Sequence, residues 1–267
     1  RFKPKLVIKY LFSKKPYEFL QFSNVSFLIL ISNYFVNWQD KFFVEIIFGL
    51  KALGVYSVTT RISNLGLIFI SSILIAAYSK YWPKNIKENT NLKVNEITGD
   101  ILLISSYSMS SLMLIVISVG QYVFPKSYSS SIDMIGWATL LVFLQTVVLI
   151  FSIDLGRLNK LRIIYLFNLA TIALQIILYS FYKFESLEEI FILQILTLSI
   201  FILVFFWKTV FVFKKEFTLA LFILASSVGL TELYLSNNFQ ILQLIAFLMS
   251  LFYISNLLQK WIKLDSD

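Results

Sequence analysis

The chain contains no cysteine and no histidine. Without cysteine it can form neither disulfide bonds nor thiolate metal sites, and without histidine it lacks the commonest metal ligand and the usual general base near neutral pH. No Gly-rich phosphate loop, Walker sequence or pair of catalytic carboxylates occurs either. We therefore expect a protein that is not an enzyme and uses no cofactor or metal.

Charged residues are also scarce, at 14% of 267 residues, whereas soluble domains carry about a quarter. Hydrophobic residues make up 58% of the chain and the mean hydropathy is +0.79. Such a chain has too little polar surface to coat a water-soluble globule, so we expect lipid to be its solvent. The net charge of +8 follows membrane topology, and we expect no nucleic-acid partner.

Eight apolar runs are each close to the ~20 residues that a helix needs to cross the hydrocarbon core. They cover residues 18–38, 54–79, 100–123, 132–152, 161–182, 188–208, 217–234 and 238–258. Runs such as Phe201–Phe206 do not alternate polar and apolar residues as the strands of membrane barrels do. The sequence therefore predicts an all-α integral membrane protein with about eight transmembrane helices.

Basic residues alternate between the segments that connect these runs. One alternating set of segments holds eighteen of the 23 Lys and Arg residues, the other set holds four, and Arg61 lies within a span. The basic set faces the cytoplasm by the positive-inside rule. We therefore predict a multi-pass protein with both ends of this sequence in the cytoplasm.

Polar residues form stripes on three predicted spans. The stripes comprise Ser23, Ser26, Asn33 and Asn37, continued outward by Asp40 and Lys41; Ser57, Thr60, Arg61, Asn64 and Ser71; and Asn168, Thr171, Gln175 and Tyr179. Such stripes either pack helices through hydrogen bonds or line a water-filled cavity. The cation of Arg61 favours a cavity between the first two spans, whereas the uncharged third stripe favours packing.

Arg61 itself allows two interpretations. Its guanidinium suits phosphate or carboxylate binding, but it could also snorkel to the outer surface or pair with Asp40 or Glu45. Asp154 and Arg157 lie together at the cytoplasmic end of their span and form a helix-end ion pair or, like Asp40, contribute to gating. No Asp or Glu is expected in the middle of any span.

Two short segments resemble one known family. The run Asn33–Val44 resembles the end of the seventh helix of bacterial polysaccharide flippases, where Asp is often followed by Arg or Lys and large apolar residues. The run Leu53–Arg61 resembles the start of their eighth helix, where a basic residue often follows five positions after the Tyr. The opening Lys3-Pro4-Lys5 resembles the cytoplasmic linker between their two lobes. The resembling region, residues 33–80, covers about a fifth of the chain.

The resemblance implies the C-terminal lobe of a flippase in the multidrug/oligosaccharidyl-lipid/polysaccharide exporter superfamily. Residues 1–17 would be a basic linker, 18–212 a six-helix lobe, and 213–267 two peripheral helices with a cytoplasmic tail. Such a protein moves undecaprenyl-pyrophosphate-linked oligosaccharide across the bacterial inner (plasma) membrane for O-antigen or capsule synthesis. Its partners would be that lipid-linked oligosaccharide, the bilayer, a missing N-terminal lobe and polysaccharide polymerase machinery. The substrate-binding residues would be Arg61, Asn33, Asn37, Asn64, Thr60 and Ser57.

Two other functions stay open. A drug or cation exporter of the same superfamily normally needs an intramembrane carboxylate, which the predicted spans lack at mid-depth. A membrane glycan polymerase or ligase usually works through a large outer loop, and the outer connections predicted here are short.

Overall fold

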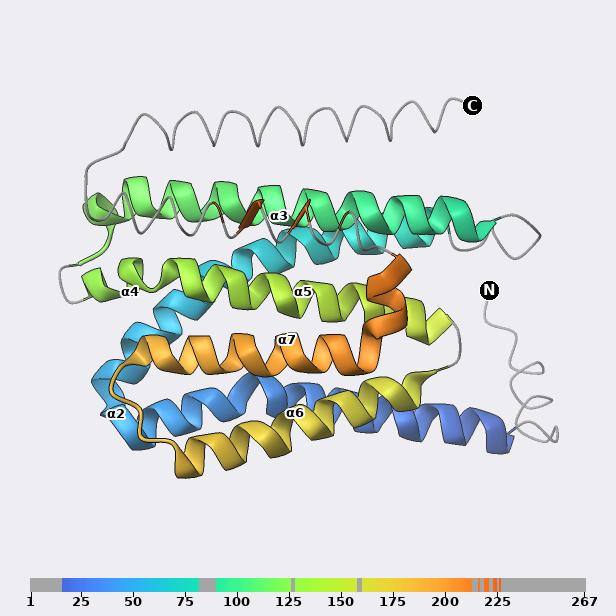
Figure 1. Ribbon diagram of the computed structural model, residues 1–267, viewed down its shortest axis with the longest axis horizontal. Helices are drawn as coiled ribbons and strands as arrows, with labels where there is room; N and C mark the ends of the chain where they lie inside the picture. Colours follow the sequence, from blue (N-terminus) through green and yellow to red (C-terminus); the bar gives the residue numbers. More distant parts are fainter. Residues whose placement is uncertain are drawn as a thin grey trace, which may run out of the picture.

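The computed structural model describes residues 16–81, 90–125, 128–157 and 160–212, together with residues 216, 219, 220, 223, 224 and 226. Its helices are α2 (Pro16–Tyr81), α3 (Thr90–Val123), α4 (Ser129–Asp133), α5 (Ile135–Arg157), α6 (Leu161–Phe181) and α7 (Leu187–Val212) (Figure 1). No strand occurs in these ranges. The all-α fold class predicted from the sequence is therefore confirmed.

Five of these helices are long and apolar enough to cross a membrane. Their apolar parts are Asn24–Ala76, Thr98–Gly120, Ile135–Ile153, Leu161–Phe181 and Leu187–Phe206. The last four coincide, within a few residues, with the predicted spans 100–123, 132–152, 161–182 and 188–208. These features fit a membrane-embedded protein.

Helix α2 is folded back on itself at Gly49. This residue has φ 83° and ψ 175°, a backbone conformation that is essentially restricted to glycine. We call residues 16–48 the first arm and residues 50–81 the second arm; they contain the predicted spans 18–38 and 54–79. The connection predicted at 39–53 is reduced to the bend at Gly49, because helix continues on both sides of this residue.

The predicted count of eight helices is not confirmed. The predicted spans 217–234 and 238–258 and the linker 1–17 lie almost wholly outside the described residues. The same holds for most of the predicted C-terminal unit 213–267.

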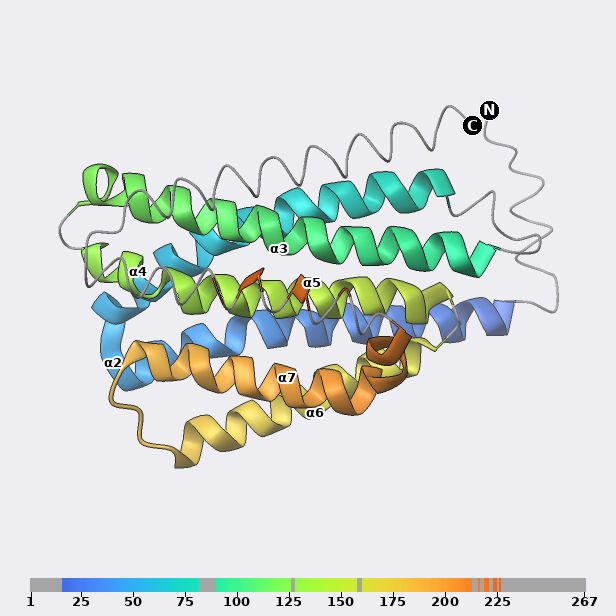
Figure 2. The same ribbon diagram turned by 45° about the horizontal axis from the view of Figure 1, so that its top comes forward.

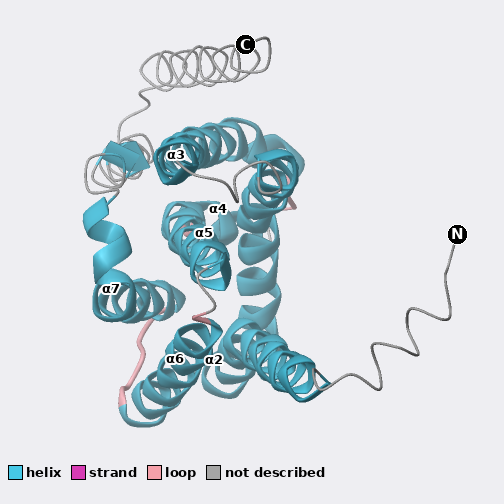
Figure 3. Ribbon diagram, turned by 90° about the vertical axis from the view of Figure 1, so that its right-hand side faces the viewer, coloured by secondary structure: helices cyan, strands magenta, loops and turns pink. Residues whose placement is uncertain are grey.

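Helix α5 occupies the middle of the bundle, with α3, α6, α7 and both arms of α2 around it (Figure 3). Phe143, Val147 and Phe151 of α5 are completely buried. The outer surface, by contrast, carries large exposed apolar side chains such as Phe27 and Phe42 on the first arm. Apolar residues on both inner and outer surfaces are expected where lipid surrounds a helical bundle.

The connections alternate between two ends of the bundle. The bend at Gly49, the α3–α4 connection and the α6–α7 connection lie at one end, and the α5–α6 connection lies at the other (Figures 1 and 2). This is the back-and-forth order that the alternation of basic residues predicts. Residues at equal sequence distances from Gly49 on the two arms consequently lie at similar depths.

Candidate functional site

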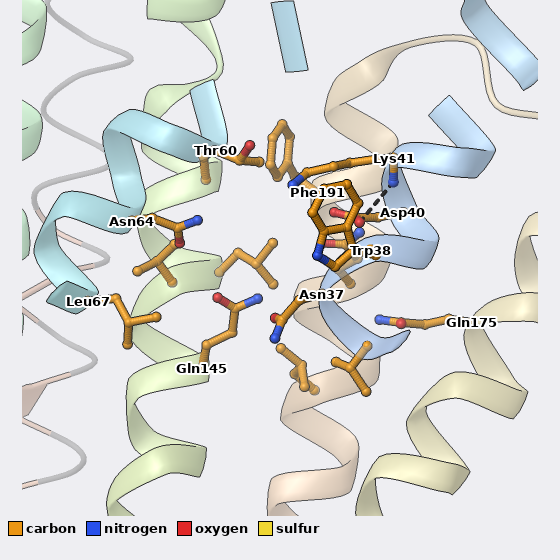
Figure 4. Close-up of a pocket in the computed structure, with 16 residues that line it drawn as sticks. Asn37, Trp38, Asp40, Lys41, Thr60, Asn64, Leu67, Gln145, Gln175 and Phe191 are labelled. Atoms are coloured by element: carbon orange, nitrogen blue, oxygen red, sulfur yellow. Dashed lines mark hydrogen bonds between the residues drawn. The ribbon is translucent and has the colours of Figure 1, made fainter. Parts of the chain in front are cut away.

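A cavity opens between the two arms of α2 and is closed behind by α5, α6 and α7 (Figure 4). It has a volume of about 290 Å³. The lining residues are Val36, Asn37, Trp38, Asp40, Lys41, Thr60, Asn64, Leu67, Ala138, Leu141, Val142, Gln145, Gln175, Phe191, Gln194 and Leu198. Amide, hydroxyl and charged groups therefore line a cavity inside an apolar bundle.

A second cavity of about 350 Å³ continues from the first. The two share the lining residues Val36, Asn37, Leu67, Gln145 and Leu198. The second also reaches Ser26, Asn33, Ser152 and Asn168. We call the combined space the polar groove; its size suits a small-molecule site, which typically occupies ~300–1,000 Å³.

Two amides in the polar groove have no hydrogen-bond partner among the described residues. They belong to Asn64 on the second arm and Gln145 on α5, and both side chains point into the first cavity (Figure 4). The Asn37 amide, by contrast, donates to the Asn33 carbonyl oxygen one turn earlier, at 2.8 Å. Asn64 and Gln145 can thus each offer both a donor and an acceptor to a ligand.

The carboxylate of Asp40 anchors a buried polar cluster beside the groove. Tyr56 donates its hydroxyl to Asp40 Oδ2 at 2.6 Å, and the main-chain N–H of Lys41 donates to Asp40 Oδ1 at 2.8 Å. Gln194 Nε2 donates to the hydroxyls of Tyr56 and Tyr179, at 3.2 and 2.7 Å. The cluster ties both arms of α2 to α6 and α7 and supplies partners to groups that burial would otherwise leave unpaired.

Asp40 lies deeper than the sequence predicted. It was expected to continue the polar stripe to the outer end of the first span. Helix continues past it, so Asp40 lies nine residues before Gly49, or about 13 Å from the bend at the helical rise of ~1.5 Å per residue. Only 8% of its surface is exposed. Asp40 therefore lies within a helical segment that is long and apolar enough to cross a membrane, whereas the sequence predicts no acidic residue in the middle of a span.

The stripe on α6 packs against the first arm, as predicted. Asn168 Nδ2 donates to Ser32 Oγ at 2.9 Å and to Asn33 Oδ1 at 2.8 Å. Gln39 Nε2 donates to Gln175 Oε1. All four predicted stripe residues on α6 are buried, and Asn168 and Gln175 also form part of the groove wall.

Some of the predicted site residues on the second arm line the polar groove and others do not. Thr60 and Asn64 line the polar groove, but Ser57 does not, and Arg61 is exposed and outside both cavities. A helix turns ~100° per residue, so Arg61 points away from the groove although Thr60 beside it faces inward. The prediction that Arg61 faces the same cavity as Asn64 is therefore wrong.

On the first arm, Asn33, Asn37 and Asp40 all line the groove, as the predicted stripe requires. The side chains of Asp154 and Arg157, which were predicted to form an ion pair or a gate, lie outside what the structure describes.

Several groove residues were missed by the sequence reasoning. Gln145, Gln175 and Gln194 line the groove from three different helices. Gln175 was recognised only as part of a packing stripe, and the other two were not considered. Lone amides within apolar runs were the signal that could have found them, because an unpaired amide in lipid is costly.

No protein-family model matches the chain, and neither a curated protein nor a solved structure matches it.

Proposed function

We propose that this protein is a flippase lobe that moves the polar head of an undecaprenyl-pyrophosphate-linked oligosaccharide across the bacterial plasma membrane. It would serve the synthesis of a surface polysaccharide such as O-antigen or capsule. The observation that carries the proposal is the polar groove, with its unpaired amides on Asn64 and Gln145 inside an otherwise apolar bundle.

Amides suit this cargo because a sugar hydroxyl both donates and accepts hydrogen bonds, as an amide does. The groove wall is mostly neutral; Asp40 and Lys41 are the charged residues among its lining side chains. A neutral polar wall binds hydroxyl groups without the desolvation that charged groups demand. The prenyl tail can stay in lipid while the sugar head occupies the groove.

Transport in this proposal needs no covalent chemistry. A second lobe of the same fold would face the groove, and rocking of the two lobes would open the groove to one side of the membrane and then to the other. The basic ends of the chain would face the cytoplasm. The resemblance of residues 33–44 and 53–61 to polysaccharide flippases supports this arrangement.

The test uses surface-glycan display from the full-length gene. We expect the double variant Asn64→Ala, Gln145→Ala to lower display at least severalfold, because each lost amide leaves sugar hydroxyls unpaired. The control is Ser72→Ala, whose hydroxyl is exposed and bonds the Ile68 carbonyl oxygen within its own helix. Wild-type display by the double variant, at normal protein level in the membrane, would contradict the proposal.

Arg61 takes no part in substrate binding in this proposal. It is exposed and lies outside both cavities, pointing away from the groove that Thr60 lines, as a snorkelling side chain does. We expect Arg61→Ala and Arg61→Lys to display surface glycan at close to the wild-type level, because neither substitution removes a groove contact. A selective loss of display in Arg61→Ala, at normal protein level, would instead give Arg61 a contact with the substrate.

Asp40 favours a second candidate, an exporter of cationic drugs. A carboxylate inside a span, lining a cavity, is the group that such an exporter needs. Drug tolerance of cells expressing the full-length gene separates the two. Loss of tolerance in Asp40→Asn together with unchanged glycan display would favour the exporter.

A further inference from the structure

The polar groove contains a cation of its own. Lys41 lines the first cavity, and its Nζ lies 4.4 Å from the ring centroid of Trp38, which lines the same cavity. The close-up shows the Lys41 side chain running over Trp38 toward the second arm, which carries Thr60 and Asn64 (Figure 4). This cation–π contact keeps the ammonium over a ring that lines the cavity.

No carboxylate forms an ion pair with the Lys41 ammonium in the described ranges. The neighbouring Asp40 attracts the Lys41 ammonium electrostatically, but its two oxygens accept hydrogen bonds from Tyr56 and from the main-chain N–H of Lys41. Glu45, one turn further along the first arm, is exposed. The ammonium therefore keeps its hydrogen-bond donors for a ligand.

A neutral amide faces the same cavity as Lys41. The Asn64 amide points into this cavity and has no hydrogen-bond partner in the described part of the chain (Figure 4). Thr60 lines the same wall, but its hydroxyl already donates to the Ser57 carbonyl oxygen at 3.2 Å. Lys41 lies eight residues before Gly49 and Asn64 lies fifteen after it, so the two differ in depth by about 10 Å at ~1.5 Å per residue. A cation and an amide donor that line one cavity form an arrangement that suits the oxygens of an extended group such as pyrophosphate.

We propose that Lys41, together with Asn64, binds the pyrophosphate group of a prenyl-linked substrate inside the polar groove. This inference rests on the proposed function, and it assigns to Lys41 the contact that the sequence had suggested for Arg61. Trp38 positions the ammonium, and its indole face partly replaces the water that the cation would otherwise keep.

The test measures binding directly rather than transport. The purified full-length protein in zwitterionic-lipid nanodiscs is titrated by calorimetry with three probes: farnesyl pyrophosphate, inorganic pyrophosphate and farnesol. We expect farnesyl pyrophosphate to bind and farnesol not to bind. Binding of inorganic pyrophosphate at similar strength would show that the anion alone is recognised; much weaker binding would show that the prenyl chain contributes.

We expect Lys41→Ala to weaken farnesyl pyrophosphate binding about tenfold or more, since a hydrogen bond to a charged group contributes about 1.5–3 kcal/mol. Lys41→Arg should stay within a few-fold of the wild type. The matched control is Lys51→Ala, an exposed lysine near the bend that does not line the groove. Thermal unfolding of each variant identifies misfolding, and Lys41→Gln, which keeps a long polar side chain, replaces Lys41→Ala if that variant unfolds.

Wild-type affinity in both Lys41→Ala and Lys41→Gln would overturn the inference, and so would the absence of any pyrophosphate binding. The proposed function fails separately, if glycan display is unchanged by the groove substitutions. Selective loss of pyrophosphate binding in Lys41→Ala would then still establish the anion site.

Discussion

At the scale of single residues, Tyr56 lies at the centre of the buried polar cluster. It is completely buried, donates to Asp40, accepts from Gln194 and stacks on Phe191 with ring centroids 4.8 Å apart. Removing only its hydroxyl keeps the stacking but leaves Asp40 Oδ2 without its donor and removes one of the two acceptors of Gln194 Nε2. Such groups are expensive inside a bundle because no water replaces the lost bond.

We therefore expect Tyr56→Phe to destabilise the protein by about 1–3 kcal/mol, the cost of leaving buried polar groups unsatisfied. The measurement is thermal unfolding of the purified protein in detergent, followed by tryptophan fluorescence. Tyr34→Phe is the control, because Tyr34 is exposed and stacks on Trp38 through its ring alone. An equal shift in both variants would argue against a structural role for the cluster.

At the scale of elements, Gly49 determines how α2 folds back. Its φ of 83° and ψ of 175° lie in a region that side-chain-bearing residues avoid. A Cβ built at Gly49 would meet no atom within 4 Å, so strain in the backbone, rather than a clash, opposes substitution. The bend in turn sets the separation of the two arms, and with it the width of the polar groove.

Gly49→Ala should therefore destabilise the protein by about 1–3 kcal/mol, the typical cost of a residue forced into this region. Gly54→Ala is a matched control within the same α2, because Gly54 is helical and its added Cβ would make ordinary contact with Tyr128 at 3.9 Å. That control should be neutral or slightly stabilising. The unfolding temperatures of the two variants are compared with that of the wild type. An equal decrease in both variants would exclude backbone strain at Gly49 as the cause.

The elements themselves were largely predictable, because apolar runs of about 20 residues leave few alternatives to membrane helices. Hydropathy predicts a reversal between the first two spans, but not its form, a single bend at Gly49 within otherwise continuous helix. The polar and charged stretch from Gln39 to Lys51 resembles a surface connection, although it contains Asp40, which the structure buries. Partners distant in sequence, Tyr56 and Gln194, make that burial tolerable, and a linear reading of polarity does not contain them.

The site was predictable to a smaller extent. Helical periodicity correctly grouped Asn33 with Asn37 and Thr60 with Asn64. It failed for Arg61, because a stripe a quarter of a turn wide includes residues at its edge that face outward. It also could not show that α5 and α7 contribute Gln145 and Gln194, since their place beside the arms depends on tertiary packing.

At the scale of the whole molecule, charge distribution predicts how the bundle is oriented in the membrane. The end formed by the α6–α7 connection carries one basic residue, Lys183, beside Glu185, Glu188 and Glu189, whereas the α5–α6 end carries Lys160 and Arg162. Positive charge is retained on the cytoplasmic side. The α6–α7 end, and with it the bend at Gly49, should therefore face outward.

Because the chain contains no cysteine, single introduced cysteines can report this orientation without background. Glu185→Cys and Lys160→Cys both replace exposed residues at opposite ends of the bundle. In intact spheroplasts a membrane-impermeant maleimide should label Glu185→Cys and leave Lys160→Cys unlabelled; after permeabilisation both should react. The reverse pattern would place the end of the bundle that contains the Gly49 bend in the cytoplasm. A substrate assembled in the cytoplasm would then enter the polar groove near Gly49, which would reverse the direction of transport along the groove.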